Sequence, residues 1–349
     1  MKDYIIVGAG LAGIAFAETL LQHKKSFVVF DNNSQNSTKI AAGLYNPVIL
    51  KRFTKVCNAN SQLEIAAKFY KAIEQKLTVQ LDYKIPIYRK FFSLEEQNNW
   101  FAASDKPNLT PFLSTKLIHK KFTGIDSPFG YGEVLKTGYV DTAALLNSYH
   151  KYLKNNDWLI ESAFNYDKLE IFDNYVQYDK LKAKHIVFAE GFGIHSNPYF
   201  NYLPLDGTKG ELLIIKALDL DLHVIINTSI YILPLGNNIY KVGATYNWDD
   251  KTNHPTEKGK QELTDRLNEI LKCNYEIIKH LAGVRPTVKD RRPLVGTHFK
   301  HKNIHILNGL GTRGVMLAPS TAIDLYNYIE VNTPLEKSID ILRYTLEQH

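Results

Sequence analysis

Cysteine, methionine and long apolar segments are scarce in this chain of 349 residues. The two cysteines, Cys57 and Cys273, lack the paired spacing of a zinc site. They are also too few for the disulfide framework of a small secreted domain. No apolar run approaches the roughly 20 residues that a membrane-spanning helix needs. We therefore expect a cytoplasmic protein without membrane spans or metal-binding cysteines.

The overall composition sets few further limits. Hydrophobic residues make up 44% and charged residues 22%, which is ordinary for a globular protein, and 349 residues suffice for two domains. The net charge of +6 permits an anionic substrate or a nucleic acid and requires neither. His298, His301 and His305 are close in sequence but have no metal-ligand spacing that we recognise, so we expect no bound metal.

The N-terminus predicts a βαβ unit, with strands at 3–7 and 27–30 around a glycine loop and a helix at 11–21. In such a unit Gly8 permits a tight turn, Gly10 lets the backbone approach a pyrophosphate, and Gly13 lets the helix pack closely. Asp31 follows the second strand, where an acid can accept hydrogen bonds from a ribose. We interpret the unit as dinucleotide-binding; a glycine turn in an unrelated α/β fold is the alternative.

A second glycine turn lies near the C-terminus. Residues 304–307 predict a strand, 309–314 a glycine-rich turn and 315–329 a helix. The N-terminus of that helix could face the electron-rich end of a reduced flavin and stabilise negative charge there. An ordinary helix start is the alternative interpretation. Between the two glycine turns the pattern predicts helices at 62–76, 94–103, 141–153 and 256–272, and strands at 170–172, 175–178, 186–189, 212–216, 229–233 and 240–245.

Several blocks of the sequence occur together in a fixed order. They read VGAGLAG at the N-terminus, AAGLYNP at 41–47, VFAEG at 187–191, DGTKGELL at 206–213, YILPLGNNIYKVGAT at 231–245, AGVRPTVKDRRPLVG at 282–296 and NGLGTRGVMLAP at 308–319. With these blocks the chain resembles the FAD-dependent D-amino acid oxidase, glycine oxidase and sarcosine oxidase group. Residues 50–130 match that group poorly.

The resemblance implies an α/β fold in which a Rossmann-like FAD-binding domain is interleaved with a substrate domain built on an antiparallel sheet. We expect the FAD domain at 1–80, 135–205 and 285–349, and the substrate domain at 81–134 and 206–284. Tyr231 and Arg285 correspond to residues that hold a substrate carboxylate, and Arg313 corresponds to an arginine near the flavin and the active site. A structural ion pair with Asp290 or another acid is the alternative for Arg285.

The same resemblance implies a set of cofactor-binding residues, drawn from both glycine turns and two internal blocks. The residues expected at FAD are Gly8, Gly10, Leu11, Ala12, Gly13, Asp31, Asn32, Ala42, Gly43, Leu44, Ala189, Gly191, Gly309, Gly311, Thr312, Arg313, Gly314, Val315 and Met316. Asp31 is shorter than the glutamate that is usual at its position. Sarcosine oxidases attach flavin to a cysteine near the block that here reads AGVRP, and no cysteine lies there, so we expect noncovalent FAD.

Within the group, AAGLYNPVILKRF and GLGTRGVMLAP are similar to the oxidoreductase half of bifunctional bacterial enzymes that modify wobble uridine in tRNA. The methyltransferase half of those enzymes is not present in this sequence. The resemblance implies oxidation of a C–N bond by hydride transfer to flavin, imine hydrolysis and reoxidation by dioxygen. A small amino acid or amine is the expected substrate. A tRNA-borne glycine-like group remains an alternative, and so does a protein that holds FAD without turnover.

Overall fold

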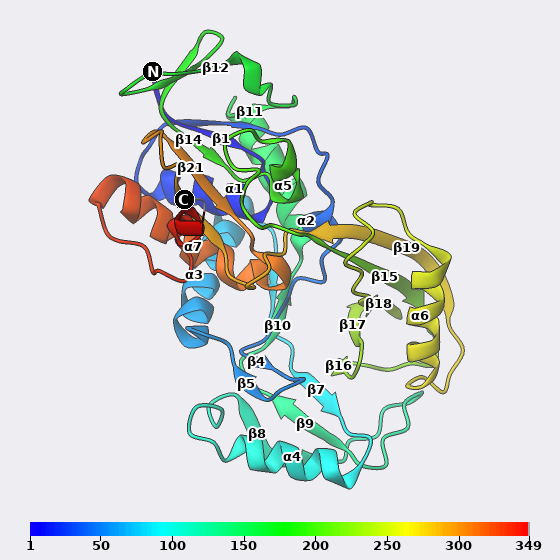
Figure 1. Cartoon of the computed structure of the whole chain (residues 1–349). Helices are drawn as coiled ribbons and strands as arrows, with labels where there is room; N and C mark the ends of the chain where they lie inside the picture. Colours follow the sequence, from blue (N-terminus) through cyan, green and yellow to red (C-terminus); the bar gives the residue numbers. More distant parts are fainter. Residues whose placement is uncertain (348–349) are drawn as a thin grey trace.

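The structure, a computed structural model, describes residues 1–347. Residues 348 and 349, which end the predicted FAD segment 285–349, lie outside the described residues. Two large sheets organise the chain, and Figure 1 shows one beside both termini and the other extending to the opposite end of the molecule. The predicted α/β fold with an interleaved, mainly antiparallel second sheet is confirmed.

The first sheet has a parallel centre because the βαβ unit brings β1 (Lys2–Val7) between β2 (Phe27–Phe30) and β14 (Leu181–Phe188). All of β2 and the last four residues of β1 are buried, as expected for strands covered on both faces. The other strands are β11 (Leu159–Ile160), β12 (Leu169–Ile171), β13 (Val176–Tyr178), β20 (Leu294–Thr297) and β21 (Ile304–Asn308).

The helices of this half pack beside the first sheet. Helix α7 (Gly314–Val331) contacts both α1 (Leu11–Gln22) and α3 (Ala59–Leu77), and α5 (Thr142–Asn155) contacts β11 and the short α2 (Ser37–Ile40). The Asp141 side chain accepts a hydrogen bond from the Ala144 amide and so caps the N-terminus of α5. Short 3-10 helices are η1 (Tyr166–Lys168), η2 (Gly191–Ser196), η3 (Gly311–Arg313) and η4 (Ile341–Glu347).

The second sheet has the order β19-β15-β18-β17-β16-β7-β9-β8, and its pairs are antiparallel except β16 with β7. Helix α6 (Glu257–Asn268) packs on β15 and β18, and α4 (Leu94–Ser104) packs on β8. The strands are β7 (Ile87–Lys90), β8 (Leu113–Ile118), β9 (Tyr131–Val134), β15 (Thr208–Lys216), β16 (Ile225–Asn227), β17 (Tyr231–Gly236), β18 (Ile239–Gly243) and β19 (Glu276–Arg285).

Two small sheets lie between the large ones. One joins β3 (Leu44–Tyr45), β10 (Gly138–Val140) and β6 (Asp82–Tyr83), and the other pairs β4 (Val48–Ile49) with β5 (Thr54–Lys55). Strand β6 falls in the predicted substrate segment 81–134, yet it pairs with β10 of the predicted FAD segment. The division into two domains at the proposed boundaries stays a prediction.

The predicted helix 256–272 is too long, because α6 ends at Asn268. Beyond it, the Lys272 amide donates to the Gly124 carbonyl and Leu271 bridges Ile125, so tertiary partners replace helical ones. Strand β19 was not predicted from the sequence, because its polar and apolar residues do not alternate regularly. Among residues 1–347, no helix combines the length and apolar character needed to cross a bilayer.

Candidate active site

A cavity of about 740 Å³ lies where the two large sheets meet. The first sheet contributes the ends of β1, β2 and β14 and the N-termini of α1 and α7, and the second contributes β15, β17, β18 and β19. Ligand-binding cavities in proteins typically measure roughly 300–1,000 Å³. The carboxyl ends of parallel strands are also where open α/β sheets bind ligands, so this cavity is the candidate site.

The N-terminal glycine loop forms one wall, and steric contacts explain two of its glycines. Gly8 has φ +100°, and a Cβ there would lie 2.5 Å from the Ala189 carbonyl oxygen. A Cβ on Gly13 would lie 1.8 Å from the Gly8 carbonyl oxygen, so α1 can approach the loop only with glycine there. At Gly10 the nearest atom is the Thr38 hydroxyl oxygen at 3.4 Å, so Gly10 leaves open the space above the helix start.

Polar side chains hold this loop in place. The Asp31 carboxylate accepts hydrogen bonds from the backbone amides of Ala9 and Asn33. His150 of α5 lies 3.0 Å from the Ala9 carbonyl oxygen through its Nε2. Asp31 is also among the residues that line the cavity. The short Asp31 side chain therefore serves first to hold the loop through these backbone amides.

The first turns of α1 and α7 both line the cavity. Neither helix has a side-chain cap or an acidic residue in its first turn within the described part of the chain. Their first backbone N–H groups lack helical acceptors, and the helix dipole adds positive potential there. Gly311, with φ +57°, has open space where its Cβ would be. Both helix starts can therefore bind anionic groups of a ligand.

The opposite wall is one face of the second sheet, cleared by glycines. Tyr231 of β17 pairs with Gly243 of β18, which pairs with Leu212 of β15, while Gly210 of β15 pairs with Gly283 of β19. Paired residues, and residues two apart along a strand, point to the same face. Arg285 therefore shares the face of Tyr231, and all of these residues line the cavity.

Arg285 lies flat across this face. A Cβ on Gly210 would fall 2.0 Å from Arg285 Nη2, so the guanidinium occupies the space that a side chain at 210 would fill. Its Nη1 donates to the Thr245 carbonyl oxygen at 3.3 Å, and its Cζ lies 4.6 Å from the centre of the Tyr246 ring. Within the described residues Arg285 forms no ion pair with Asp290, whose carboxylate binds Arg343 instead.

Tyr231 approaches from the other side. A Cβ on Gly243 would lie 2.6 Å from the Tyr231 hydroxyl, so the phenol ring lies over β18. Strands β17 and β19 are separated by roughly 14 Å, and the two side chains span that gap from opposite edges. Burial raises the pKa of the Tyr231 hydroxyl above its ordinary value of 10.0, and the charge of Arg285 opposes this only in part. Tyr231 is therefore a protonated donor at neutral pH.

The cavity brings together most of the residues expected from the sequence. Gly13 and Gly309 are not in its lining: Gly13 packs against Gly8, and a Cβ on Gly309 would meet the Val288 side chain at 2.6 Å. The expected residues that do line it are Gly8, Gly10, Leu11, Ala12, Asp31, Asn32, Ala42, Gly43, Leu44, Ala189, Gly191, Tyr231, Arg285, Gly311, Thr312, Arg313, Gly314, Val315 and Met316.

Glu190 and Thr38 are polar residues of the lining that the sequence reasoning missed. Glu190 accepts hydrogen bonds from Tyr166 and Asn197, and burial raises the pKa of its carboxyl to about 7. Thr38 accepts a hydrogen bond from the Leu11 amide at 3.4 Å. Glu190 stands inside a block quoted for the family resemblance, so its position was a usable signal, whereas Thr38 carried none.

The described residues that line the cavity include no cysteine and no cluster of metal-ligating side chains. Cys57 lines a separate cavity of about 550 Å³. Groups of three or more metal-ligating side chains do not occur among residues 1–347. Arg313 lines both cavities, and burial together with the charge of Arg292 lowers its pKa.

A glycine loop, two uncapped helix starts and a long cavity suit a dinucleotide cofactor with two phosphates and an electron-accepting ring. An arginine and a protonated tyrosine on the opposite wall suit an anionic substrate beside that ring. Fold and site together define the class of protein as a redox enzyme with a dinucleotide cofactor. The chain belongs to the family of FAD dependent oxidoreductases, whose family model matches residues 3–325. The predicted enzyme type, cofactor and family are confirmed.

Two similar proteins match nearly the whole chain, and a third matches part of it. Glycine oxidase from Bacillus subtilis (strain 168) is 23% identical over 361 residues, covering 95% of this chain and 94% of that protein. The crystal structure of glycine oxidase from Bacillus cereus ATCC 14579 superposes with a TM-score of 0.74 at 21% identity, covering 96% of each chain. The tRNA 5-methylaminomethyl-2-thiouridine biosynthesis bifunctional protein MnmC of Idiomarina loihiensis is 26% identical over 150 residues, 41% of this chain and 24% of that protein.

Proposed function

We propose that this FAD-dependent oxidoreductase oxidises the C–N bond of a small amino acid or N-substituted glycine. The observation that carries the proposal is the convergence of Arg285 and Tyr231 on a glycine-cleared sheet face that lines the cofactor cavity. A free carboxylate is the ligand that a guanidinium and a neutral phenol bind together. The full-length similarity to glycine oxidase supports the same substrate class.

The protein's own residues would position the substrate. Arg285 would pair with the carboxylate while Tyr231 donates a hydrogen bond to it, which fixes the α-carbon between them and the cofactor. Val315 and Met316 in the first turn of α7 would stand at the ring end of the cofactor, with the helix N-terminus stabilising negative charge. Such an arrangement works through orientation and requires no general base.

Bound FAD would supply the electron acceptor for the hydride on the carbon next to nitrogen, and dioxygen would be the final oxidant and become hydrogen peroxide. As the C–H bond breaks, the nitrogen lone pair would form the C=N bond, and water would add to the imine to release a carbonyl acid and an amine. We propose that the FAD is bound noncovalently, since no described residue of the cavity lining is a cysteine. Heat denaturation should therefore release all flavin into the supernatant.

Anaerobic flavin reduction tests the proposal. The holoenzyme is mixed with glycine, sarcosine or D-amino acids, and bleaching of the flavin absorbance is followed. We expect bleaching by at least one of them, lost in Arg285→Ala and kept in Arg291→Ala. The control is matched because Arg291 also stacks on an aromatic ring, that of Trp248 at 4.8 Å, but is outside the cavity lining. Equal loss in both variants would contradict the assignment of Arg285.

A second candidate is a tRNA substrate that carries a glycine-like group. Tyr246 and Trp248 are 57% and 38% exposed, and each ring is backed by an arginine, Arg285 and Arg291 respectively. Exposed aromatic rings beside cations are typical of surfaces that stack nucleobases. Bleaching of the flavin only by tRNA bearing a carboxymethylaminomethyl-uridine, and by no free amino acid, would favour this candidate over the first.

A further inference from the structure

The segment 244–256 links β18 to α6, and we call it the strap. Ala244 and Tyr246 at its start line the cavity, and Asn247 pairs with Lys209 of β15. Its first residues hold Arg285: the Thr245 carbonyl accepts a hydrogen bond from the guanidinium, and the Tyr246 ring stacks on it. Further along, the Asn253 side chain accepts a hydrogen bond from the amide of Val284, the residue before Arg285. The position of the strap thus decides what surrounds the Arg285 guanidinium.

Strand alternation places Lys209 under the strap. Gly210 and Leu212 face the cavity, so Lys209 and Glu211 point to the other face of β15. The backbone of Lys209 exchanges two hydrogen bonds with that of Asn247, at 2.8 and 3.0 Å. Likewise, the Thr245 amide donates to the Glu211 carbonyl, and the Glu211 amide donates to the Thr245 hydroxyl. Backbone pairing therefore fixes the first part of the strap.

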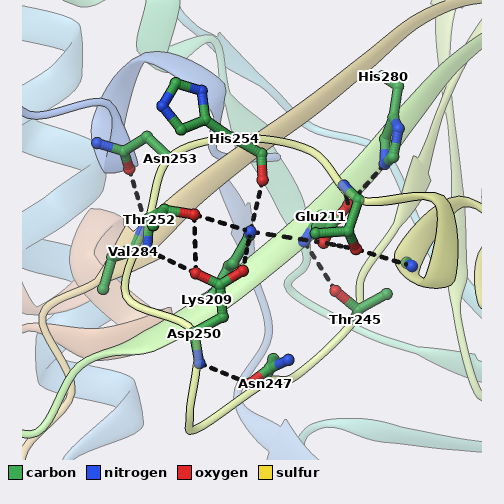
Figure 2. A network of polar contacts seen from close by, with 12 residues as sticks. Lys209, Glu211, Thr245, Asn247, Asp250, Thr252, Asn253, His254, His280 and Val284 are labelled. Atoms are coloured by element: carbon green, nitrogen blue, oxygen red, sulfur yellow. Dashed lines mark hydrogen bonds and ion pairs between the residues drawn. The ribbon is translucent and has the colours of Figure 1, made fainter.

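The side chain of Lys209 fixes the second part. Lys209 is completely buried, and its ammonium donates to the Asp250 carboxylate, the Thr252 hydroxyl and the His254 carbonyl. Figure 2 shows this ammonium at the centre of the turn that these three acceptors form. An ammonium has three N–H donors, and all three hydrogen bonds go to the strap. The Glu211 carboxylate of β15 adds an ion pair with the same ammonium at 3.9 Å. The hydrogen bond from Lys209, together with those from the Thr252 amide and hydroxyl, lowers the pKa of the Asp250 carboxyl to about 2.

We propose that Lys209 is a positioning residue for substrate binding: its buried ammonium clamps the strap so that Thr245 and Tyr246 hold Arg285 over Gly210. This inference rests on the proposed function, because it assigns Lys209 a role in presenting the carboxylate-binding arginine. A buried ammonium that loses an acceptor must draw in water or move, which releases the segment it held. Lys209 itself is not among the residues that line the cavity.

Two adjacent aspartates provide a matched test. Asp250 forms the ion pair with Lys209. The Asp249 backbone amide donates a hydrogen bond to the Asn247 side chain, but the Asp249 side chain forms no hydrogen bond within the described chain. In Asp250→Asn we expect the KM for sarcosine or glycine and the Kd for acetate to rise about tenfold. Acetate binding is measured by titrating the oxidised holoenzyme and following the flavin spectrum. The kcat and the FAD content should change less than twofold, and Asp249→Asn should match the wild type.

Lys209→Met and Asp250→Glu complete the set. Lys209→Met removes the ammonium that binds Asp250, Thr252 and His254, and should raise the same KM and the same Kd for acetate. Asp250→Glu keeps the carboxylate charge, so both constants should stay within about threefold of the wild type. The inference is overturned if Asp250→Asn leaves both constants unchanged. It is also overturned if kcat and FAD content fall together with affinity, which would indicate general destabilisation.

The failure of the proposed function has a different signature. A wild-type enzyme that binds acetate but is reduced by none of the amines would contradict the proposed reaction, and acetate affinity in the variants would still decide the role of Lys209. A wild type that neither binds acetate nor is reduced would overturn both proposals.

Discussion

The Arg285 guanidinium lies directly over the α-carbon of Gly210, so that a methyl group at position 210 would fall 2.0 Å from Nη2. The two residues are joined by the register of β15 and β19, in which Gly210 pairs with Gly283 and Arg285 follows two residues later. The arginine can cross the sheet only because its neighbouring strand carries no side chain there. Glycine at 210 is thus part of the site, although it has no chemistry of its own.

Gly210→Ala should therefore displace the arginine and weaken substrate binding. We expect KM to rise at least tenfold with little change in FAD content, because the three atoms nearest to the added methyl group all belong to the guanidinium. Steady-state kinetics and the flavin-to-protein absorbance ratio check both. Gly193→Ala is the control, since its Cβ would lie 3.5 Å or more from any neighbour in an ordinary contact. An unchanged KM in Gly210→Ala would show that Arg285 does not bind the substrate in this position.

Tyr231→Phe should raise KM about five- to tenfold, because the substrate carboxylate loses one hydrogen-bond donor. The contribution of Tyr231 should also be independent of pH from 7 to 10. The pKa of its hydroxyl is raised by burial, so the group stays protonated throughout this range. A pH series of kcat/KM for the wild type and Tyr231→Phe gives the ratio of the two values at each pH. A ratio that falls toward one between pH 8 and 10 would mean that Tyr231 ionises there, contrary to its buried setting.

Gly10→Ala and Gly13→Ala should fail in different ways. A Cβ on Gly10 meets only the Thr38 hydroxyl at 3.4 Å, so the apoprotein should fold normally but bind FAD at least tenfold more weakly. A Cβ on Gly13 would lie 1.8 Å from the Gly8 carbonyl oxygen, so this variant should lower the thermal midpoint of the apoprotein itself. Calorimetry of the apoproteins and FAD titration separate the two effects. Equal FAD affinity in Gly10→Ala and wild type would show that the pyrophosphate of FAD does not lie against Gly10.

His298 should make stability fall as the pH falls. Burial, with smaller contributions from His301 and Lys300, lowers the pKa of His298 to about 4 from its ordinary 6.5. The unfolded chain then binds more protons than the folded one between these values, so stability is complete above about pH 6.5 and is lost toward pH 4. The Glu190 carboxyl, with its pKa raised to about 7, acts in the opposite direction over pH 4.5 to 7.

The difference between wild type and His298→Asn isolates the histidine from Glu190. Asparagine can still accept the hydrogen bond that the Lys300 amide donates to Nδ1, and it does not titrate. Between pH 7 and pH 5 the thermal midpoint of wild type should drop by about 3 °C more than that of His298→Asn. His195→Asn, at an exposed histidine, should behave as wild type. If the thermal midpoints of wild type and His298→Asn change with pH in parallel, His298 is not held neutral by burial.

Much of the first sheet could be predicted because its signals are local. The strand 27–30 was predicted at the bounds it has, and the helix after the glycine loop begins at Leu11 as expected. Residues 81–134 gave only one correct element, α4, because the strands β7, β8 and β9 are short and partly exposed. Strand β19 was missed because its exposed first half carries lysine and histidine, and only pairing with β15 makes it a strand.

The sequence by itself determined the glycine loop, its following helix and the family, because these depend on residues adjacent in the chain whose steric requirements are local. Tertiary structure alone decided how Arg285 and Tyr231 meet, since that depends on the register of four strands and on glycines at 210 and 243. The same holds for Lys209, which reads as an ordinary surface lysine in the sequence. It is buried only because the strap returns over β15 and supplies three acceptors for one ammonium.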